Sequence, residues 1–338
     1  MSRRWVGAGG LAIYPDLAGC EGDMTLNATD ATTVLGETQP GGETPGDIVR
    51  GAEEMAGAKP SRKVLLGFVP ISVLLVGFFL APLMVMVLYS LWTMEGFNVV
   101  PHWTLVNYVH FFTAGMYTAI LLKTAAISLL VTILALLFGY PFAYFLVRYV
   151  NKKWQILLLV LVIIPFWTSY LLRVYAWMGI LGRKGVINQF LMAIGLVHEP
   201  LEFLLYNNFS VTLVFLYLYL PFAIITLYAS LEKFDFNQIN AAMDLGATPW
   251  RAFVEVMLPQ TKQGVITAFL FIFIPMLGEY ITPKLVGGTD GTMMANLIVN
   301  LFRGFQFPAG SAIALSIAVL ITLILIVFRR YLRVEELY

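Results

Sequence analysis

An acidic side chain within an apolar stretch is the feature of this sequence best suited to bind a ligand. Glu279 is the one charged residue between Gln263 and Pro283, and it follows Pro275 by four positions. An unpaired carboxylate in hydrocarbon is costly, so such a residue is a functional candidate. Proline removes a backbone hydrogen bond and kinks a helix, which would let the carboxylate turn toward a central path. The chemistry expected here is recognition of a cation, and no residue is expected to be catalytic.

Aromatic residues are expected to contribute to the same cation path, because aromatic faces attract cations through their quadrupole. One lies next to Glu279, and the others lie in the apolar stretch 154–181. Two alternatives stay open. Glu279 could pair with Arg173 or Lys284 as a structural lock, and the aromatic residues could form a belt at the membrane interface. The expected substrate path consists of Glu279, Tyr280, Trp167, Tyr170, Tyr175 and Trp177.

Neither a metal site nor a cofactor is expected. His102, His110 and His198 fall in expected outer loops, at no metal-ligand spacing. Cys20 is the single cysteine, which excludes a disulfide framework, a cysteine-based zinc site and an iron–sulfur cluster. The formal net charge of +1 leaves no basic excess for binding nucleic acid.

The elements that must position these residues are membrane helices. Of the 338 residues, 59% are hydrophobic and 12% charged, against about 45–50% and about 25% in soluble chains. Residues 1–62 are small, polar and acidic, and are expected to form a disordered tail. The expected domain, residues 63–338, is all-α. At about 20 residues a span, its six expected helices cover residues 64–92, 118–148, 154–181, 207–231, 263–283 and 306–330.

Lys and Arg outside the helices predict the orientation. Six spans place both termini on one side, and a cytoplasmic N-terminus puts twelve basic residues inside against four outside. An interfacial or re-entrant helix is expected in the long outer segment 183–206. The inner residues are Lys59, Arg62, Lys63, Arg148, Lys152, Lys153, Lys233, Arg251, Lys262, Arg329, Arg330 and Arg333, and the outer ones are Arg183, Lys184, Lys284 and Arg303.

A polar interruption separates the fourth and fifth expected helices, and we call this segment, residues 232–262, the elbow. Asp235 followed three positions later by Gln238 approximates a capping box, which predicts a first short helix from about Phe236. Gly246 suits the left-handed position that ends a helix.

A second short helix is predicted after this turn. Thr248 and Pro249 supply an N-cap and a first-position proline, and Pro259 is expected to end the helix. Its apolar residues recur at helical spacing and are expected to pack on the bundle, which leaves the first helix and the turn exposed. These residues are Trp250, Phe253, Val254 and Met257.

The exposed part of the elbow is suited to contact with another protein. Ala241 and Ala242 keep its surface flat, while Asn240 and Asp244 supply polar contacts. The alternative is an amphipathic linker that lies among the lipid headgroups.

Residues of the elbow carry a resemblance to a known family. Permeases of binding-protein-dependent ABC importers share the pattern Glu-Ala-Ala, three residues, Gly, nine residues, Ile, one residue, Leu-Pro. This sequence has Asn240-Ala241-Ala242, Gly246, Val256 and Leu258-Pro259 in the same register. It departs from the pattern at two positions. Asn240 replaces the glutamate, which removes a charge and leaves open whether this position forms a salt bridge, and Val256 conservatively replaces the isoleucine.

Two further stretches resemble the spermidine/putrescine branch of that family. They are "IPFWTSYLLRVYAWMGILGRKGVINQFL" (164–191) and "FIPMLGEYITPKLVGG" (273–288). The resemblance implies a six-helix, type I ABC importer permease in the bacterial cytoplasmic membrane, which carries polyamines or a similar small organic cation. It also implies three kinds of partner: a second permease, a pair of ATP-binding subunits and an extracytoplasmic substrate-binding protein.

By the same resemblance, the elbow is a coupling helix that docks in a groove of the ATPase. The sequence holds no G-x-x-x-x-G-K-[ST] phosphate loop, so ATP hydrolysis is expected on the partner. The expected coupling residues are Asn240, Ala241, Ala242, Asp244, Gly246 and Pro259.

Three alternatives remain at this point. The first is a permease of the same class for another small solute, such as an amino-acid-like compound, a phosphonate or chelated iron. The second is a secondary transporter or channel that needs no ATPase, and the third is a membrane scaffold that uses the elbow for docking.

Overall fold

The structure, a computed structural model, describes residues 62–332, with side chains from residue 69 to residue 329. The expected tail therefore lies outside the described residues, apart from Arg62. The chain divides into two units, Met1–Leu74 and Leu75–Tyr338, and the sites discussed below belong to the second. Apart from loops and turns, the described part is helical with one hairpin, formed by strands β1 (Thr93–Glu95) and β2 (Asn98–Val100).

Five helical segments of the described part are long and apolar enough to cross a membrane. Apart from the polar start of the run that ends in α11, apolar residues lie on all sides of these helices, as expected where both lipid and neighbouring helices surround them. Exposed residues such as Phe78 and Phe79 of α2 suit contact with lipid. The segments lie in α2 (Arg62–Ser90), α4 (Gly115–Tyr149), α8 (Asn208–Leu231), the run that ends in α11 (Leu258–Leu277), and α14 (Phe307–Leu332).

The span expected over 154–181 is broken rather than one straight helix. The structure has α5 (Lys152–Ile163), a 3-10 turn η1 (Ile164–Trp167) and α6 (Tyr170–Leu181). The direction changes by 91° between Lys152–Trp167 and the segment that follows it, and the pair would count as a sixth span. Pro165 cannot donate a backbone hydrogen bond, and Thr168, with φ −85° and ψ 150°, is extended.

The fifth expected helix also differs from the prediction at both ends. It begins at Pro249 with α10 (Pro249–Ala252), passes through a π-turn η3 (Phe253–Met257) and continues as α11. Pro259 therefore does not end a helix. Because the N–H of Leu258 bonds to the carbonyl of Phe253, five residues back, the wider turn accommodates the proline at the start of α11. At its other end α11 stops before Gly278, and α12 (Ile281–Val286) follows.

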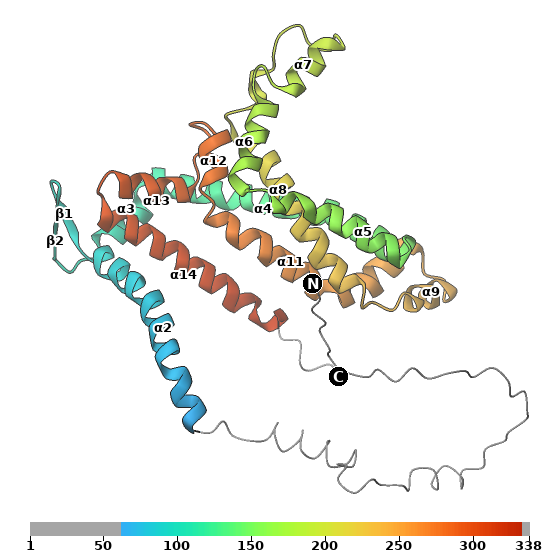
Figure 1. Ribbon diagram of the computed structural model, residues 1–338, viewed down its shortest axis with the longest axis horizontal. Coiled ribbons are helices and arrows are strands. Elements are labelled where there is room, and N and C mark those ends of the chain that lie inside the picture. Colours follow the sequence, from blue (N-terminus) through green and yellow to red (C-terminus); the bar gives the residue numbers. More distant parts are fainter. Residues whose placement is uncertain (1–61, 333–338) are drawn as a thin grey trace, which may run out of the picture. The chain divides into compact units, whose positions relative to one another are not determined.

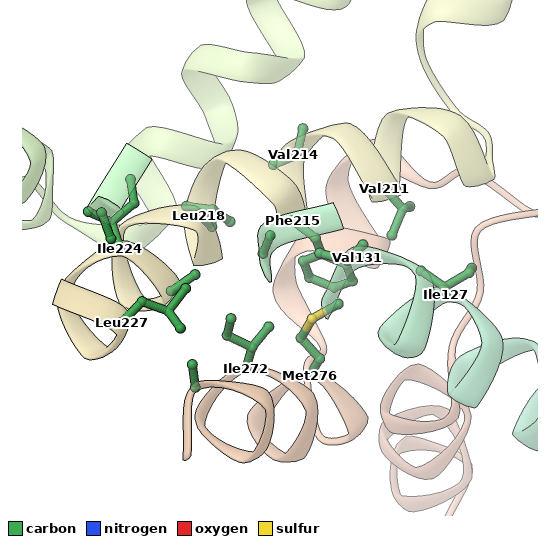
Figure 2. Packing of buried hydrophobic residues seen from close by; sticks show 14 of the residues in the cluster. Ile127, Val131, Val211, Val214, Phe215, Leu218, Ile224, Leu227, Ile272 and Met276 are labelled. Carbon is green, nitrogen blue, oxygen red and sulfur yellow. The ribbon is translucent and has the colours of Figure 1, made fainter. Parts of the chain in front are cut away.

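Helices α4, α8 and α11 form the main core. Figure 2 shows apolar side chains from the three helices meeting in one cluster, which includes Val131 of α4, Phe215 of α8 and Met276 of α11. All three side chains are fully buried. A smaller cluster joins α3 (Val106–Thr113), α13 (Met294–Arg303) and α14.

The two ends of this bundle are built differently (Figure 1). The short helix α9 (Asn237–Asp244) and the start of α5 lie at one end, and the hairpin, α3 and α13 lie at the other. The outer segment expected to be helical contains α7 (Val186–Ala193). Helix α4 has 35 residues, about 52 Å at 1.5 Å per residue. It is thus longer than the roughly 30 Å hydrocarbon core, and its ends reach beyond that layer.

Candidate functional site

The turn of the elbow has the local structure that its residue types dictate. Gly246 has φ +92°, in the left-handed region. The N–H of Ala247 bonds to the carbonyl of Ala242 at 3.0 Å, which closes the 6→1 bond of a Schellman cap. The side-chain oxygen of Thr248 accepts from the N–H of Arg251 at 3.3 Å, and Pro249 is the first residue of α10.

The start of α9 departs from the prediction. Asp235 accepts a bond from the N–H of Asn237 at 3.0 Å, but the expected capping box with Gln238 does not form. Gln238 instead accepts from Gln260, beyond the turn. The helix starts at Asn237, with Phe236 at the capping position.

The packing of the second elbow helix is only partly as expected. Met257 is fully buried and Phe253 half-buried, but Val254 and Trp250 are exposed, Trp250 by 73%. Leu245, beside Gly246, is 90% exposed. Trp250 and Leu245 are thus large apolar side chains displayed near a polar turn, the kind of feature that marks an interaction surface.

The expected coupling residues lie on or beside this surface. Ala241, Asp244 and Gly246 are exposed, and Asn240 and Ala242 are half-buried. Pro259 is also exposed, but it belongs to the start of α11 rather than to the turn.

Arg148, near the end of α4, holds the elbow from the side. One of its terminal nitrogens donates to Oδ1 of Asn240 at 3.4 Å. Its guanidinium also lies 5.3 Å from the ring centre of Phe236, within cation–π range. Asn240 is the position at which this chain departs from the family pattern, and Arg148 is the charged residue that contacts it.

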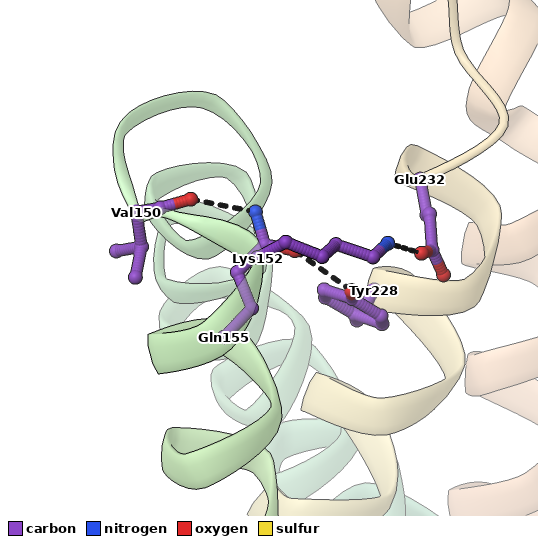
Figure 3. Close-up of polar contacts among 5 residues, drawn as sticks. All are labelled: Val150, Lys152, Gln155, Tyr228 and Glu232. Atoms are coloured by element: carbon purple, nitrogen blue, oxygen red, sulfur yellow. Dashed lines mark hydrogen bonds and ion pairs between the residues drawn. The ribbon is translucent and has the colours of Figure 1, made fainter. Parts of the chain in front are cut away.

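A second group of polar contacts joins the start of α5 to the end of α8 (Figure 3). The hydroxyl of Tyr228 donates to Oε1 of Gln155 at 3.0 Å, and Nε2 of Gln155 donates to the carbonyl of Val150 at 2.7 Å. Lys152 pairs with Glu232 and lowers the pKa of its carboxyl by hydrogen bonding. The ion pair is exposed and stabilises the fold little, because water and salt screen it. A buried donor or acceptor left without its hydrogen-bond partner, in contrast, costs about 1–3 kcal/mol.

Glu279 lies at the opposite end of α11 from the elbow, in the break before α12. Its Oε1 accepts from the N–H groups of Ile281 and Thr282 at 2.8 and 3.0 Å. These bonds orient the half-buried carboxylate and stabilise its charge.

Two phenols lie near this carboxylate. The hydroxyl of Tyr170, the first residue of α6, is 2.6 Å from that of Thr282. Tyr170 and Tyr219 both interact electrostatically with Glu279. Tyr219 was missed by the sequence analysis, although a tyrosine two positions before Pro221 in a charge-free helix is a signal that could have found it.

The alternative of a structural lock on Glu279 is not found among the described side chains. Neither Arg173 nor Lys284 pairs with it, since the ion pairs formed in this part of the chain are Lys152–Glu232, Arg183–Glu202 and Arg251–Glu255. The guanidinium of Arg173 instead lies 4.5 Å from the ring centre of Phe166 and 5.7 Å from that of Tyr170. Its Nε is buried without a hydrogen-bond partner.

The other expected aromatic residues are dispersed. Tyr280 is next to Glu279, and its carbonyl accepts from Asn296 at 2.9 Å. Trp177 packs edge-on against Tyr217 with 5.2 Å between ring centres. Trp167 and Tyr175 are exposed by 89% and 46%, which fits the alternative of an interfacial belt.

Two further features of the opposite end were not anticipated. Lys123, which the count of basic residues passed over, lies within α4, and its Nζ donates to the carbonyl of Asp290 at 2.8 Å. A hollow of about 350 Å³ lies away from Glu279; Thr93 and Phe97 near the hairpin and Gln306 before α14 help to line it.

Helices of this length and apolarity, joined by an exposed elbow, are those of a multi-pass membrane protein. Residues 135–334 match the family model described as binding-protein-dependent transport system inner membrane component, and the chain belongs to this family. The predicted resemblance is thereby confirmed, and the scaffold and ATPase-independent alternatives are set aside.

Several named relatives cover most of the chain. The spermidine/putrescine transport system permease protein PotB of Haemophilus influenzae is 34% identical over 76% of this chain and 89% of its own length. PotB of Escherichia coli is 33% identical over 67% and 82%. The inner membrane ABC transporter permease protein YdcU of Escherichia coli is 33% identical over 69% and 77%.

A solved structure has the same fold. It is the crystal structure of a bacterial ABC transporter involved in the import of the acidic polysaccharide alginate, with a TM-score of 0.59 and 17% identity over 81% of this chain and 96% of that one. The chain is therefore a type I ABC importer permease of the inner membrane and not an enzyme, and ATP hydrolysis belongs to a separate subunit. The family implies an ATP-binding subunit, a partner permease and a binding protein.

Proposed function

We propose that this permease translocates polyamines or a similar small organic cation. The observation that carries the proposal is Glu279, a carboxylate near the phenols of Tyr170 and Tyr219 with no Lys or Arg side chain paired to it among the described residues. An ammonium group suits such a site, because it can pair with the carboxylate and contact aromatic faces. The names of the PotB relatives support the same class of substrate.

The proposed path is narrower than the one expected from the sequence. It keeps Glu279, Tyr280 and Tyr170 and adds Tyr219 and Thr282. Trp167 and Tyr175 are left out because they are exposed on the surface of this chain, and Trp177 because it packs against Tyr217.

The orientation proposed for the chain places the elbow and both termini in the cytoplasm, with a membrane domain over residues 63–338. The distribution of Lys and Arg supports it. In this orientation the elbow docks on the ATP-binding subunit through Asn240, Ala241, Ala242, Asp244 and the turn at Gly246. The exposed Leu245 and Trp250 supply apolar contacts.

The test of the substrate uses the complete transporter in proteoliposomes, with spermidine uptake as the measurement. Glu279→Gln keeps the oxygen that accepts from α12 and removes the charge. A hydrogen bond to a charged group contributes about 1.5–3 kcal/mol, so uptake should fall by about tenfold or more. Glu95→Gln makes the same change at an exposed position of strand β1 and should have no effect. Wild-type uptake by Glu279→Gln would exclude Glu279 from the path.

The test of docking is co-purification of the ATP-binding subunit in mild detergent. Asp244→Arg should abolish it while the permease stays inserted in the membrane. Glu199→Arg, the matched change at an exposed acidic residue of the outer segment, should not. Retention of the subunit by Asp244→Arg would contradict docking at this face of the elbow.

A further inference from the structure

The elbow is continuous with only two of the core helices, α8 and α11. A movement of the elbow must therefore reach the bent helix pair, α5 and α6, in another way. The elbow follows α8 and runs into α11 through the π-turn. Helices α5 and α6 have no such connection, yet α6 begins with Tyr170, which bonds to Thr282 beside Glu279. A displacement of the elbow can therefore reach Glu279 through α5 and α6 only if side-chain contacts hold α5 to the elbow or to the helix next to it.

Helix α5 has one buried side chain, and that side chain is polar. Gln155 is 6% exposed, whereas Ile156, Leu157, Val160 and Leu161 of the same helix are exposed. A buried amide must be hydrogen-bonded to avoid a large penalty. Both ends of the Gln155 amide are used, one by Tyr228 at 3.0 Å and one by Val150 at 2.7 Å. The bond to Tyr228 is therefore a specific attachment of α5 to the end of α8, four residues before the elbow (Figure 3).

A second contact reaches the same turn from α9. Arg148 precedes the α4–α5 turn, and it holds Asn240 at 3.4 Å and the ring of Phe236 at 5.3 Å. Val150, which accepts the bond from Gln155, lies two residues after Arg148. The α4–α5 turn is thus held by α9 through Arg148 and by α8 through Gln155.

We propose that Arg148, Gln155 and Tyr228 are positioning residues that couple the elbow to α5, so that ATP-driven displacement of the elbow moves the α5–α6 break and the residues around Glu279. This coupling rests on the proposed docking of the elbow. The three residues do not touch the substrate and act through the helices that they connect. Lys152–Glu232 joins the same elements, but as an exposed ion pair it contributes less.

The test measures spermidine uptake and ATP hydrolysis in the same proteoliposomes of the complete transporter and takes their ratio. Tyr228→Phe removes the hydroxyl that holds Gln155. The expected result is a complete complex that hydrolyses ATP at a rate near wild type, with uptake per ATP reduced severalfold. Tyr108→Phe is the matched control, because its hydroxyl donates to Ser90 at 2.9 Å at the opposite end of the bundle. This control should leave the ratio unchanged.

A double variant separates coupling from stability. Gln155→Leu with Tyr228→Phe replaces both partners by apolar groups, which relieves the cost of an unpaired buried amide. If the bond only stabilises the fold, the double variant recovers the wild-type ratio, and that result overturns the proposal. If the bond transmits motion, the ratio stays low although thermal stability recovers. The double variant also answers the question if Tyr228→Phe alone does not assemble.

The outcome is distinguishable from a failure of the proposed function. If the elbow does not dock, Asp244→Arg retains the ATP-binding subunit. If the chain does not carry polyamines, the wild-type transporter takes up no spermidine. If only the coupling proposal is wrong, Asp244→Arg loses the ATP-binding subunit and the wild-type transporter takes up spermidine. Tyr228→Phe then has the same uptake per ATP as Tyr108→Phe.

Discussion

At the elbow, Asp244 and Leu245 project into solvent from a turn whose path depends on the left-handed backbone of Gly246. At the other end of α11, Glu279 is half-buried, is held by two N–H groups and lies near phenols from α6 and α8. Helix α11 between them has 20 residues, about 30 Å at 1.5 Å per residue. The proposed function of the elbow depends on its backbone conformation, whereas that of the region around Glu279 depends on a charged side chain. Backbone changes should therefore be most harmful at the elbow, and isosteric changes of charge or hydroxyl at the opposite end.

The largest effect is expected from Gly246→Pro. Proline requires φ near −65°, whereas Gly246 has φ +92°, so the turn cannot keep its path. Co-purification of the ATP-binding subunit should be lost, with the membrane helices still inserted. Gly246→Ala should weaken association by about five- to thirtyfold, since the left-handed region costs about 1–2 kcal/mol for other residues.

Gly195 supplies the control for that prediction. It too has a positive φ, +72°, and open space where a Cβ would lie, but it follows α7 in the outer segment. Gly195→Ala should leave ATPase binding unchanged. Equal effects at the two glycines would show that backbone strain in general, and not the shape of the elbow, controls association.

A smaller effect is expected from Tyr219→Phe, which tests the charged end without changing its shape. The phenol of Tyr219 interacts electrostatically with Glu279, and removing its hydroxyl is expected to cost about as much as a typical hydrogen bond, about 0.5–1.5 kcal/mol, so spermidine uptake should fall by about two- to tenfold. Tyr217→Phe is the matched control, two residues away and packed on Trp177. If the two variants behave alike, the phenol of Tyr219 has no special relation to Glu279.

The next effect concerns the position at which the elbow departs from the family pattern. Asn240→Glu would place a carboxylate beside Arg148, which now donates to the amide oxygen at 3.4 Å. A partly exposed pair contributes about 0.2–1 kcal/mol, so the melting temperature should rise slightly. The rise should vanish when Arg148→Met is already present. A gain of the same size in both backgrounds would show that Arg148 is not the partner.

The smallest effect is a dependence of stability on pH at the end of α8. The hydrogen bond from Lys152 lowers the pKa of Glu232 in the folded chain. The stabilisation is complete above the unfolded pKa of about 4.3 and is lost as the pH falls through the folded value. Glu232→Gln should therefore reduce thermal stability at neutral pH but not in acid below both values. A loss that persists in acid would assign the effect to packing.

Local features of the elbow could be predicted from the sequence because they depend on residues close together in the chain. Gly246, Thr248 and Pro249 each have the conformation or cap expected of their type. The end of the second helix was predicted wrongly, because the rule for Pro259 assumes a regular α-helix. A π-turn before it changes which N–H groups are needed.

The region of Glu279 shows where such prediction stops. The sequence marked the carboxylate and Tyr170, but it also allowed a salt bridge that does not form among the described side chains. Tyr170 and Tyr219 belong to α6 and α8 and come close to Glu279 because of the 91° bend and the packing of α12 on those helices. The residue pattern within one segment does not predict how that segment packs against another segment far away in the sequence.

By itself, then, the sequence determined the membrane class, the family and the turn of the elbow, because composition, motif spacing and backbone preferences act over a few residues. Only the tertiary structure decided the partners of Glu279, the contact between Arg148 and Asn240 and the attachment of α5 through Gln155. These contacts join residues far apart in the chain, and their distances depend on how the helices bend and pack.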